Sequence, residues 1–251
     1  MELVDARKLM DATGEFYARV AASFSATRGG AWPGWERVLE AARSCMSDGM
    51  RVLDLACGNL RFERFLAERA GAADVLAVDG CEALATDLPA GVRWRELDIA
   101  SALLEEGALA ASLGEEGFDL AVCFAFAHHL PLAEQRARLV AELASCLRPG
   151  GCAALSFWQF ADDERLLAKA REASSRGRLA LGLSADALGE NDYLLGWADE
   201  RDAFRFCHHF TEDEIDALVS AAPFADEIAR FSADGREGSL NRYVVLAKRA
   251  G

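Results

Sequence analysis

The residue pattern between positions 50 and 158 constrains the fold of this chain more than any other feature. Short apolar runs of strand length alternate there with segments of helical periodicity. The run FDLAVCFAF at 118–126 is so apolar that both of its faces should be covered. Strands that alternate with helices in this way predict a parallel sheet with helices on both faces.

We expect one domain over residues 1–251, because the chain shows no internal repeat and no interdomain linker. Residues 1–47 read as a helical cap that TRGGAWPGW interrupts, and residues 48–160 read as the core sheet. Residues 161–209 interrupt the alternation and predict a charge-rich helical lid. Residues 210–251 predict a closing helix and two strands, FADEIARF and NRYVVLAKR.

Charge and cysteine content limit the possible partners and compartment. The net charge of -14 repels phosphate backbones, so a nucleic-acid role would need a local basic patch or a helper subunit. Acidity is also a common means of staying soluble. The seven cysteines form no C-x-x-C pair, MELVDARKLM lacks the layout of a signal peptide, and no apolar run is long enough to span a membrane. We expect a soluble cytoplasmic protein with reduced thiols.

Acidic side chains come at the ends of successive predicted strands. Asp54 lies just before the turn at Gly58, Asp79 follows 21 residues after Gly58, and Asp98 ends the third strand. Ligands of open parallel sheets bind at the carboxyl ends of the strands, and an acid about 20 residues after the glycine turn suits ribose hydroxyls. Ala56 and Leu60 stand where glycines would admit a pyrophosphate. The pattern therefore favours a nucleoside with an amino-acid tail, and the alternative is a tight turn that only starts a helix.

The ordered segments VLDLACGN, VLAVDG, ELDIA, FDLAVCFAFAHHL and LRPGG resemble those of class I S-adenosylmethionine-dependent methyltransferases over roughly residues 50–158. The resemblance implies a Rossmann-like α/β fold with seven strands, mostly parallel, and a last strand, here NRYVVLAKR, that runs antiparallel. It implies S-adenosyl-L-methionine as the cofactor and S-adenosyl-L-homocysteine as the product.

Carried onto this chain, the resemblance also implies a set of cofactor contacts. The methionine end would lie against the turn after the first strand, the ribose against the end of the second, and the adenine beside the end of the third. The residues implied are Tyr17, Arg28, Trp32, Asp54, Ala56, Gly58, Asn59, Asp79, Gly80, Asp98, Ile99, Phe124 and His129.

A narrower resemblance lies outside the core. FSATRGGAWPGW, FAFAHHL and RFCHHF are similar to segments of the tRNA methyltransferases that esterify the carboxymethyl group of a wobble uridine, although residues 161–200 match that subgroup poorly. This implies tRNA as substrate and a small zinc-binding activator subunit as partner. Two alternatives stay open: methylation of a small carboxylic acid or metabolite, and a non-catalytic cofactor-binding regulator.

Methyl transfer to a carboxylate needs alignment rather than a strong base, because the nucleophile is already an anion at neutral pH. The catalytic candidates are Arg28, His128, His129, Arg205 and His208. Guanidinium groups match carboxylates, whereas Arg28 could equally be a surface charge and the histidines could cap or flank core elements. No carboxylate or thiol lies at a spacing that would support the histidine pairs as ligands, so we expect no metal.

Overall fold

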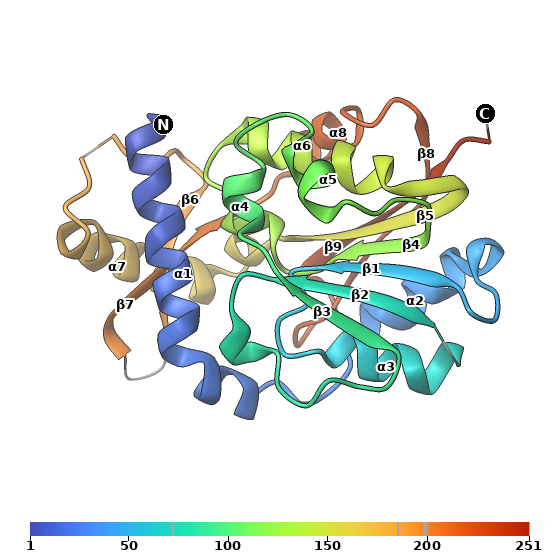
Figure 1. Cartoon of the computed structure of the whole chain (residues 1–251). Coiled ribbons are helices and arrows are strands. Elements are labelled where there is room, and N and C mark those ends of the chain that lie inside the picture. The colour runs from blue at the N-terminus through green and yellow to red at the C-terminus, as the bar shows by residue number, and fades with distance from the viewer. Residues whose placement is uncertain (72, 185, 198–199, 251) are drawn as a thin grey trace.

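A seven-stranded sheet forms the centre of the protein in a computed structural model that describes residues 1–71, 73–184, 186–197 and 200–250 (Figure 1). The strand order is β3-β2-β1-β4-β5-β9-β8. The strands are β1 (Arg51–Leu55), β2 (Asp74–Asp79), β3 (Val92–Glu96), β4 (Phe118–Cys123), β5 (Leu147–Trp158), β8 (Ala225–Ala233) and β9 (Asn241–Lys248). Strands β1 to β5 pair in parallel, and β9 runs antiparallel to both β5 and β8. The predicted fold class is confirmed.

Helices cover both faces of this sheet, as the apolar strands require. One face packs against α4 (Ile99–Ala102), α5 (Ala108–Leu113), α6 (Ala133–Ser145) and α8 (Glu212–Val219), and the other against α2 (Pro33–Ala41) and α3 (Arg61–Ala70) (Figure 1). Side chains alternate along β1, so that Leu53 and Leu55 join the first face while Val52 joins the second.

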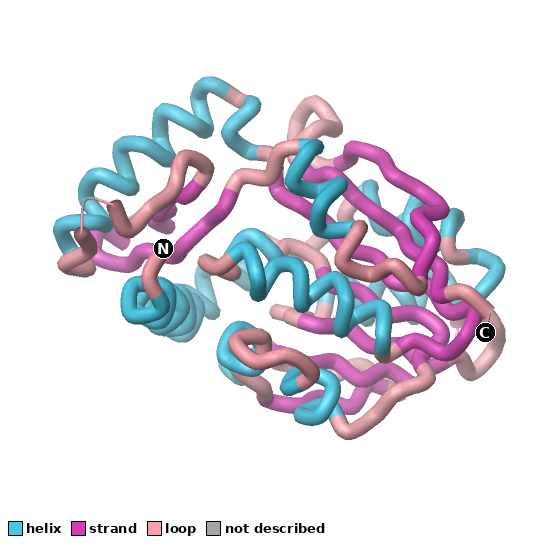
Figure 2. The backbone as a smooth tube through the Cα atoms, turned by 90° about the horizontal axis from the view of Figure 1, so that it is seen from above, coloured by secondary structure: helices cyan, strands magenta, loops and turns pink. Residues whose placement is uncertain are grey.

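The first helix, α1 (Leu3–Ala26), stands beside the sheet and packs on a separate two-stranded hairpin (Figures 1 and 2). The hairpin consists of β6 (Asp192–Trp197) and β7 (Glu200–His208), and α7 (Glu164–Ala180) lies against β6. The helical cap expected at the N-terminus is therefore present.

The lid predicted over 161–209 is only half helical, and this corrects the sequence interpretation. Alternating side chains explain the difference, because Phe204 and Phe206 on one face of β7 pack with Leu194 and with Leu9 of α1. That period of two is characteristic of a strand. Residues 185, 198 and 199 of the predicted lid lie outside the described residues.

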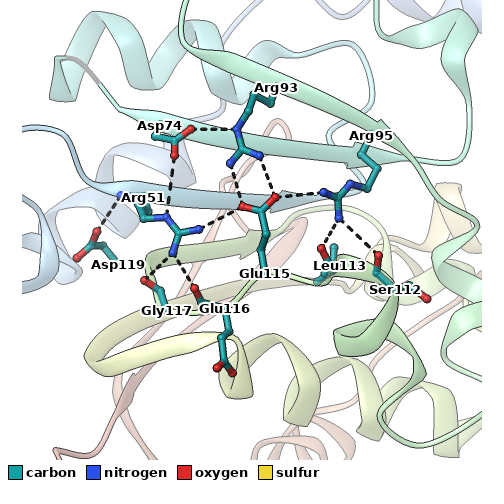
Figure 3. A network of polar contacts seen from close by, with 10 residues as sticks. All are labelled: Arg51, Asp74, Arg93, Arg95, Ser112, Leu113, Glu115, Glu116, Gly117 and Asp119. Carbon is teal, nitrogen blue, oxygen red and sulfur yellow. Dashed lines mark hydrogen bonds and ion pairs between the residues drawn. The ribbon is translucent and has the colours of Figure 1, made fainter.

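A polar network joins the amino-terminal ends of the strands, at the edge away from the carboxyl ends (Figure 3). Glu115, just before β4, pairs with Arg93 at 2.9 Å, with Arg95 at 3.1 Å and with Arg51 at 3.2 Å. Arg93 also pairs with Asp74 at 3.2 Å. These contacts tie β1, β2 and β3 to the segment that enters β4.

Within the described part of the chain, no helix combines the length and the apolar character that a bilayer crossing demands.

Candidate functional site

A cleft of about 750 Å³ opens at the carboxyl ends of β1, β2 and β4. Side chains of α1, of the segment between α1 and α2, and Arg205 of β7 also line it. Parallel sheets place their ligands at this edge, and the volume falls in the range of small-molecule sites.

The turn after β1 adopts the left-handed conformation at three positions. Ala56, Gly58 and Leu60 have φ of 62°, 55° and 59°. Glycine adopts this conformation most easily, so the chain folds here at a conformational cost that a glycine-rich turn would not carry. Asp79 stabilises the turn by accepting a hydrogen bond from the backbone N–H of Gly58 at 2.8 Å.

The three strand-end aspartates all line the cleft, as the sequence predicted. Asp79 also accepts from the backbone N–H of Cys81 at 2.8 Å, and Asp98 accepts from the backbone N–H of Ser101 at 3.0 Å and so caps α4. Burial raises the pKa of Asp79 although these backbone donors act in the opposite direction. Asp54 is 2% exposed, and no N–H group of the described residues donates to its side chain.

A hydrogen-bonded chain of side chains links α1 to β7 across the cleft. His129 Nδ1 lies 2.7 Å from the carbonyl oxygen of Phe206, and its Nε2 lies 2.9 Å from the Tyr17 hydroxyl. Since a carbonyl only accepts, Nδ1 carries the proton and Nε2 accepts from Tyr17. Burial, followed by the nearby Arg205, lowers the pKa of His129 to about 3, and burial raises the pKa of Tyr17 to about 12. Both side chains are therefore neutral at physiological pH.

Two arginines bring positive charge into this neutral surrounding. Arg205 is 7% exposed, and its guanidinium lies 4.7 Å from the ring centroid of Phe16. Within the part of the chain that the structure describes, its Nε and Nη1 have no hydrogen-bond partner. Arg28 lies 5.3 Å from the ring of Phe24 and 5.4 Å from that of Trp197. Burial and then Arg205 lower the pKa of Arg28. Among the described residues, no carboxylate forms an ion pair with either arginine, so the pair attracts an anionic ligand group.

The structure brings together a potential metal-ligand set that sequence spacing does not reveal. His128, His129 and Cys207 each place one ligand atom within 4.8 Å of the others, because β7 carries Cys207 to the histidines. The inference that no thiol supports these histidines was therefore wrong. Both nitrogens of His129 are already hydrogen-bonded, and Arg205 adds a positive charge beside the group. The absence of a bound metal stays a prediction.

His208 is a correction to the catalytic candidates, because it lies outside the cleft. Its Nδ1 and Nε2 bind Asp192 and Glu214, each at 2.7 Å, and Glu214 also pairs with Arg136 at 3.2 Å. With both nitrogens engaged by carboxylates, His208 joins the hairpin to α8 and has no free atom for a ligand. The segment RFCHHF alone does not indicate that His208 binds two carboxylates that other elements supply.

The remaining predicted site residues share one property, which is that they line the cleft. These are Tyr17, Arg28, Trp32, Asp54, Ala56, Gly58, Asn59, Asp79, Gly80, Asp98, Ile99, Phe124, His128, His129 and Arg205. The side-chain roles assigned to them stay predictions.

Sequence reasoning missed two acids of this region. Asp234 lines the cleft and accepts hydrogen bonds from the backbone of Gly34 and from the side chains of Asn241 and Tyr243. It belongs to a turn far along the chain, and no local pattern indicates this. Glu63 lies buried on α3 beside Asp54. The one feature of the sequence that could have indicated its burial is its position next to the apolar residues Phe62, Phe65 and Leu66.

Residues 52–151 match the protein family described as "Methyltransferase domain". This segment is therefore similar to a methyltransferase domain. Its fold is that of the class I S-adenosylmethionine-dependent enzymes.

Solved methyltransferases share the architecture around this domain. The structure is similar to Burkholderia thailandensis 1,6-didemethyltoxoflavin-N1-methyltransferase with bound S-adenosylhomocysteine, with a TM-score of 0.62 and 18% identity over 100% of this chain and 93% of that one. It is similar to N-methyltransferase NodS of Bradyrhizobium japonicum in complex with S-adenosyl-L-homocysteine, with a TM-score of 0.58 and 14% identity over 94% and 98% of the two chains. At these identities the likeness concerns the fold.

One curated relative matches in sequence. Mouse tRNA (carboxymethyluridine(34)-5-O)-methyltransferase ALKBH8 is 32% identical over 144 residues, which are 57% of this chain and 19% of the mouse protein. The chain thus spans about a fifth of the length of that relative.

Proposed function

We propose that this chain transfers a methyl group from S-adenosyl-L-methionine to a carboxylate oxygen, and that the acceptor is a carboxymethylated uridine at the wobble position of tRNA. The observation that carries the proposal is the buried guanidinium of Arg205, which faces the cleft with Arg28 beside it and without a carboxylate partner among the described residues. A buried cation of this kind favours an acceptor that brings its own negative charge.

The residues of the cleft suit the cofactor. In this proposal Asp79 binds the ribose hydroxyls, and Asp98 and Ile99 flank the adenine, which their position in the lining of the cleft supports. Gly58 leaves room for the amino-acid tail, because a side chain there would face open space. When bound, the cofactor supplies an electrophilic methyl group. The chain's part is to hold the acceptor carboxylate in line with that methyl group.

Proton transfer to the protein is not required in this scheme. His129 has a pKa of about 3 and Tyr17 one of about 12, so neither exchanges a proton readily near neutrality. The Tyr17–His129 hydrogen bond instead fixes α1 over the cleft. Arg205, with planar N–H groups and a pKa above its ordinary value, orients the acceptor carboxylate.

The tRNA acceptor is supported by the partial match to the mouse carboxymethyluridine methyltransferase and by the N-terminal segment FSATRGGAWPGW. The net charge of -14 opposes tRNA binding by this chain alone, which is why we include a small zinc-binding activator subunit in the proposal. The same charge favours a second candidate, a small carboxylic acid that enters the cleft without phosphate contacts.

Transfer of labelled methyl groups separates these possibilities. The protein, with and without the activator subunit, is incubated with labelled cofactor and either tRNA rich in carboxymethyluridine or a fractionated small-molecule extract. We expect label that mild alkali releases as methanol, because a methyl ester hydrolyses whereas methyl groups on nitrogen, carbon or ribose do not. Ribonuclease-sensitive label identifies tRNA, label in the extract identifies the small acid, and alkali-stable label contradicts carboxylate methylation.

A further inference from the structure

Two buried carboxyl groups lie against each other behind the cleft. Asp54 of β1 and Glu63 of α3 are each 2% exposed and lie within hydrogen-bonding contact of one another. Among the described residues, neither Glu63 oxygen has any other side-chain partner, and no N–H group donates to the Asp54 side chain. Asp54 lines the cleft, whereas Glu63 lies behind it.

Two bare carboxylates cannot share so small a buried space, since each lacks water and repels the other. Burial, followed by the neighbouring acid, raises the pKa of Asp54 far above its ordinary range, and burial raises the pKa of Glu63. The charged groups that face the pair are Asp79 on β2 and Arg64 on α3, and the thiols of Cys57 and Cys123 lie close by. The pair therefore keeps at least one proton, which forms the hydrogen bond between the two carboxyls.

Among the described residues, Asp54 accepts fewer N–H hydrogen bonds than three other aspartates of the cleft do. Asp79 receives two backbone N–H groups, Asp98 receives one, and Asp234 receives one backbone and two side-chain donors. Asp54 has only the hydrogen bond that it shares with Glu63. A buried carboxylate with unused acceptor capacity that faces a cleft is suited to a ligand N–H group, and most of all to an ammonium.

We propose that Glu63 is a positioning residue that donates its proton to Asp54, so that the Asp54 carboxylate can receive the ammonium group of the cofactor's amino-acid tail. The inference rests on the cofactor assignment and adds to it that cofactor binding is linked to pH. In the binding-competent state Glu63 is protonated and Asp54 is ionised. When both acids are protonated, binding the ammonium releases one proton to solvent.

The linkage has a definite sign. At pH values below the first titration of the pair, each unit of acidification should weaken cofactor binding by about tenfold, and above it the affinity should be constant. A ligand without an ammonium group should not show this dependence. S-adenosylhomocysteine and 5′-methylthioadenosine form the matched ligand pair, because both carry the adenosine and thioether and only the first has the amino-acid tail.

The experiment measures both dissociation constants by calorimetry from about pH 5.5 to about pH 7.5, in buffers of different ionisation enthalpy. In the wild-type protein, S-adenosylhomocysteine should bind more weakly at acid pH with proton release, and 5′-methylthioadenosine should bind equally at all pH values. Glu63→Gln should keep the affinity at the upper pH and shift its loss to lower pH, because the amide N–H replaces the donated proton permanently. Glu63→Leu, which leaves Asp54 without a donor, should bind S-adenosylhomocysteine about tenfold more weakly near neutrality and 5′-methylthioadenosine normally.

The possible failures are distinguishable. If neither ligand binds the folded wild-type protein, the cofactor assignment itself is wrong. If both ligands show the same pH dependence, or if Glu63→Gln keeps the wild-type profile, Asp79 or another group titrates and the role of Glu63 is refuted. Equal weakening of both ligands by Glu63→Leu would show that Glu63 only shapes the fold.

Discussion

Arg205→Met should make the protein more stable and less active, and the opposed signs follow from the environment of this arginine. Its Nε and Nη1 are buried and have no hydrogen-bond partner among the described residues, and each unsatisfied buried donor costs about 1–3 kcal/mol. The guanidinium lies 4.7 Å from the ring centroid of Phe16 and 5.8 Å from that of Tyr17, and each cation–π contact stabilises the fold by about 0.5–2 kcal/mol. Methionine has a similar length and needs no donor, so we expect a gain of about 1–3 kcal/mol in the free energy of unfolding.

The expected loss of activity comes from the acceptor carboxylate. A hydrogen bond between two charged groups contributes about 1.5–3 kcal/mol, which corresponds to a loss of about 10- to 150-fold in kcat/KM for the acceptor. Urea unfolding reports the stability, and transfer of labelled methyl reports the activity. The affinity for S-adenosylhomocysteine should change little, since the cofactor has its own contacts in the cleft.

Arg205→Lys is the matched control for this experiment. It keeps the positive charge and loses the planar fork, so its activity should lie between those of wild type and Arg205→Met. The reasoning would be refuted if Arg205→Met were less stable than wild type. A destabilised variant whose activity falls only in proportion to its unfolded fraction would show that Arg205 supports the packing of α1 on β7.

Three further changes test other parts of the site. Asp79→Asn should weaken S-adenosylhomocysteine binding by about 10- to 150-fold in calorimetry, because a charged acceptor for ribose hydroxyls becomes neutral. Arg28→Ala should lower turnover more than the midpoint of thermal unfolding, and equal losses would show a structural role. The pKa of His208 is raised in the folded protein. Burial is the largest single influence and lowers this pKa, but the hydrogen bonds to Asp192 and Glu214 together raise it by more. Protonated His208 therefore stabilises the fold below its unfolded pKa and loses this effect as pH rises, so the difference in midpoint between wild type and His208→Gln should shrink from about pH 6 to about pH 8.5.

The core sheet and the position of the cleft could be predicted because they depend on local signals. Strands β1, β2 and β4 are short apolar runs that each end in a turn, and the carboxyl ends of parallel strands share an edge whatever the details of packing. Asp54, Asp79 and Asp98 were therefore placed correctly from the sequence alone.

Features that depend on contacts between distant segments could not be predicted. The hairpin of β6 and β7 forms because Leu194, Phe204 and Phe206 meet Leu9 of α1, and the charged residues around them had suggested helices. The position of His208 depends on Asp192, which lies across the hairpin. The acid pair of Asp54 and Glu63 needs the registry of α3 against β1, which the sequence pattern does not specify.

Substitutions in the turn after β1 test whether backbone strain or side-chain packing dominates at the two positions where Ala56 and Leu60 replace glycine. Ala56 and Leu60 both have left-handed φ values, which cost about 1–2 kcal/mol for a residue with a Cβ. Ala56→Gly removes this cost but adds about 0.4–1 kcal/mol of chain entropy to the unfolded state, so its stability should stay equal or rise by up to about 1 kcal/mol. Leu60→Gly relieves the same backbone and deletes a fully buried side chain, whose loss costs about 2–5 kcal/mol. It should therefore lower stability by about 1–4 kcal/mol in urea unfolding. If Leu60→Gly were as stable as wild type, backbone strain would outweigh burial in this turn. If Ala56→Gly were strongly destabilised, the Ala56 methyl group would contribute packing to the turn, and the alanine would be a supporting contact where we infer a tolerated departure.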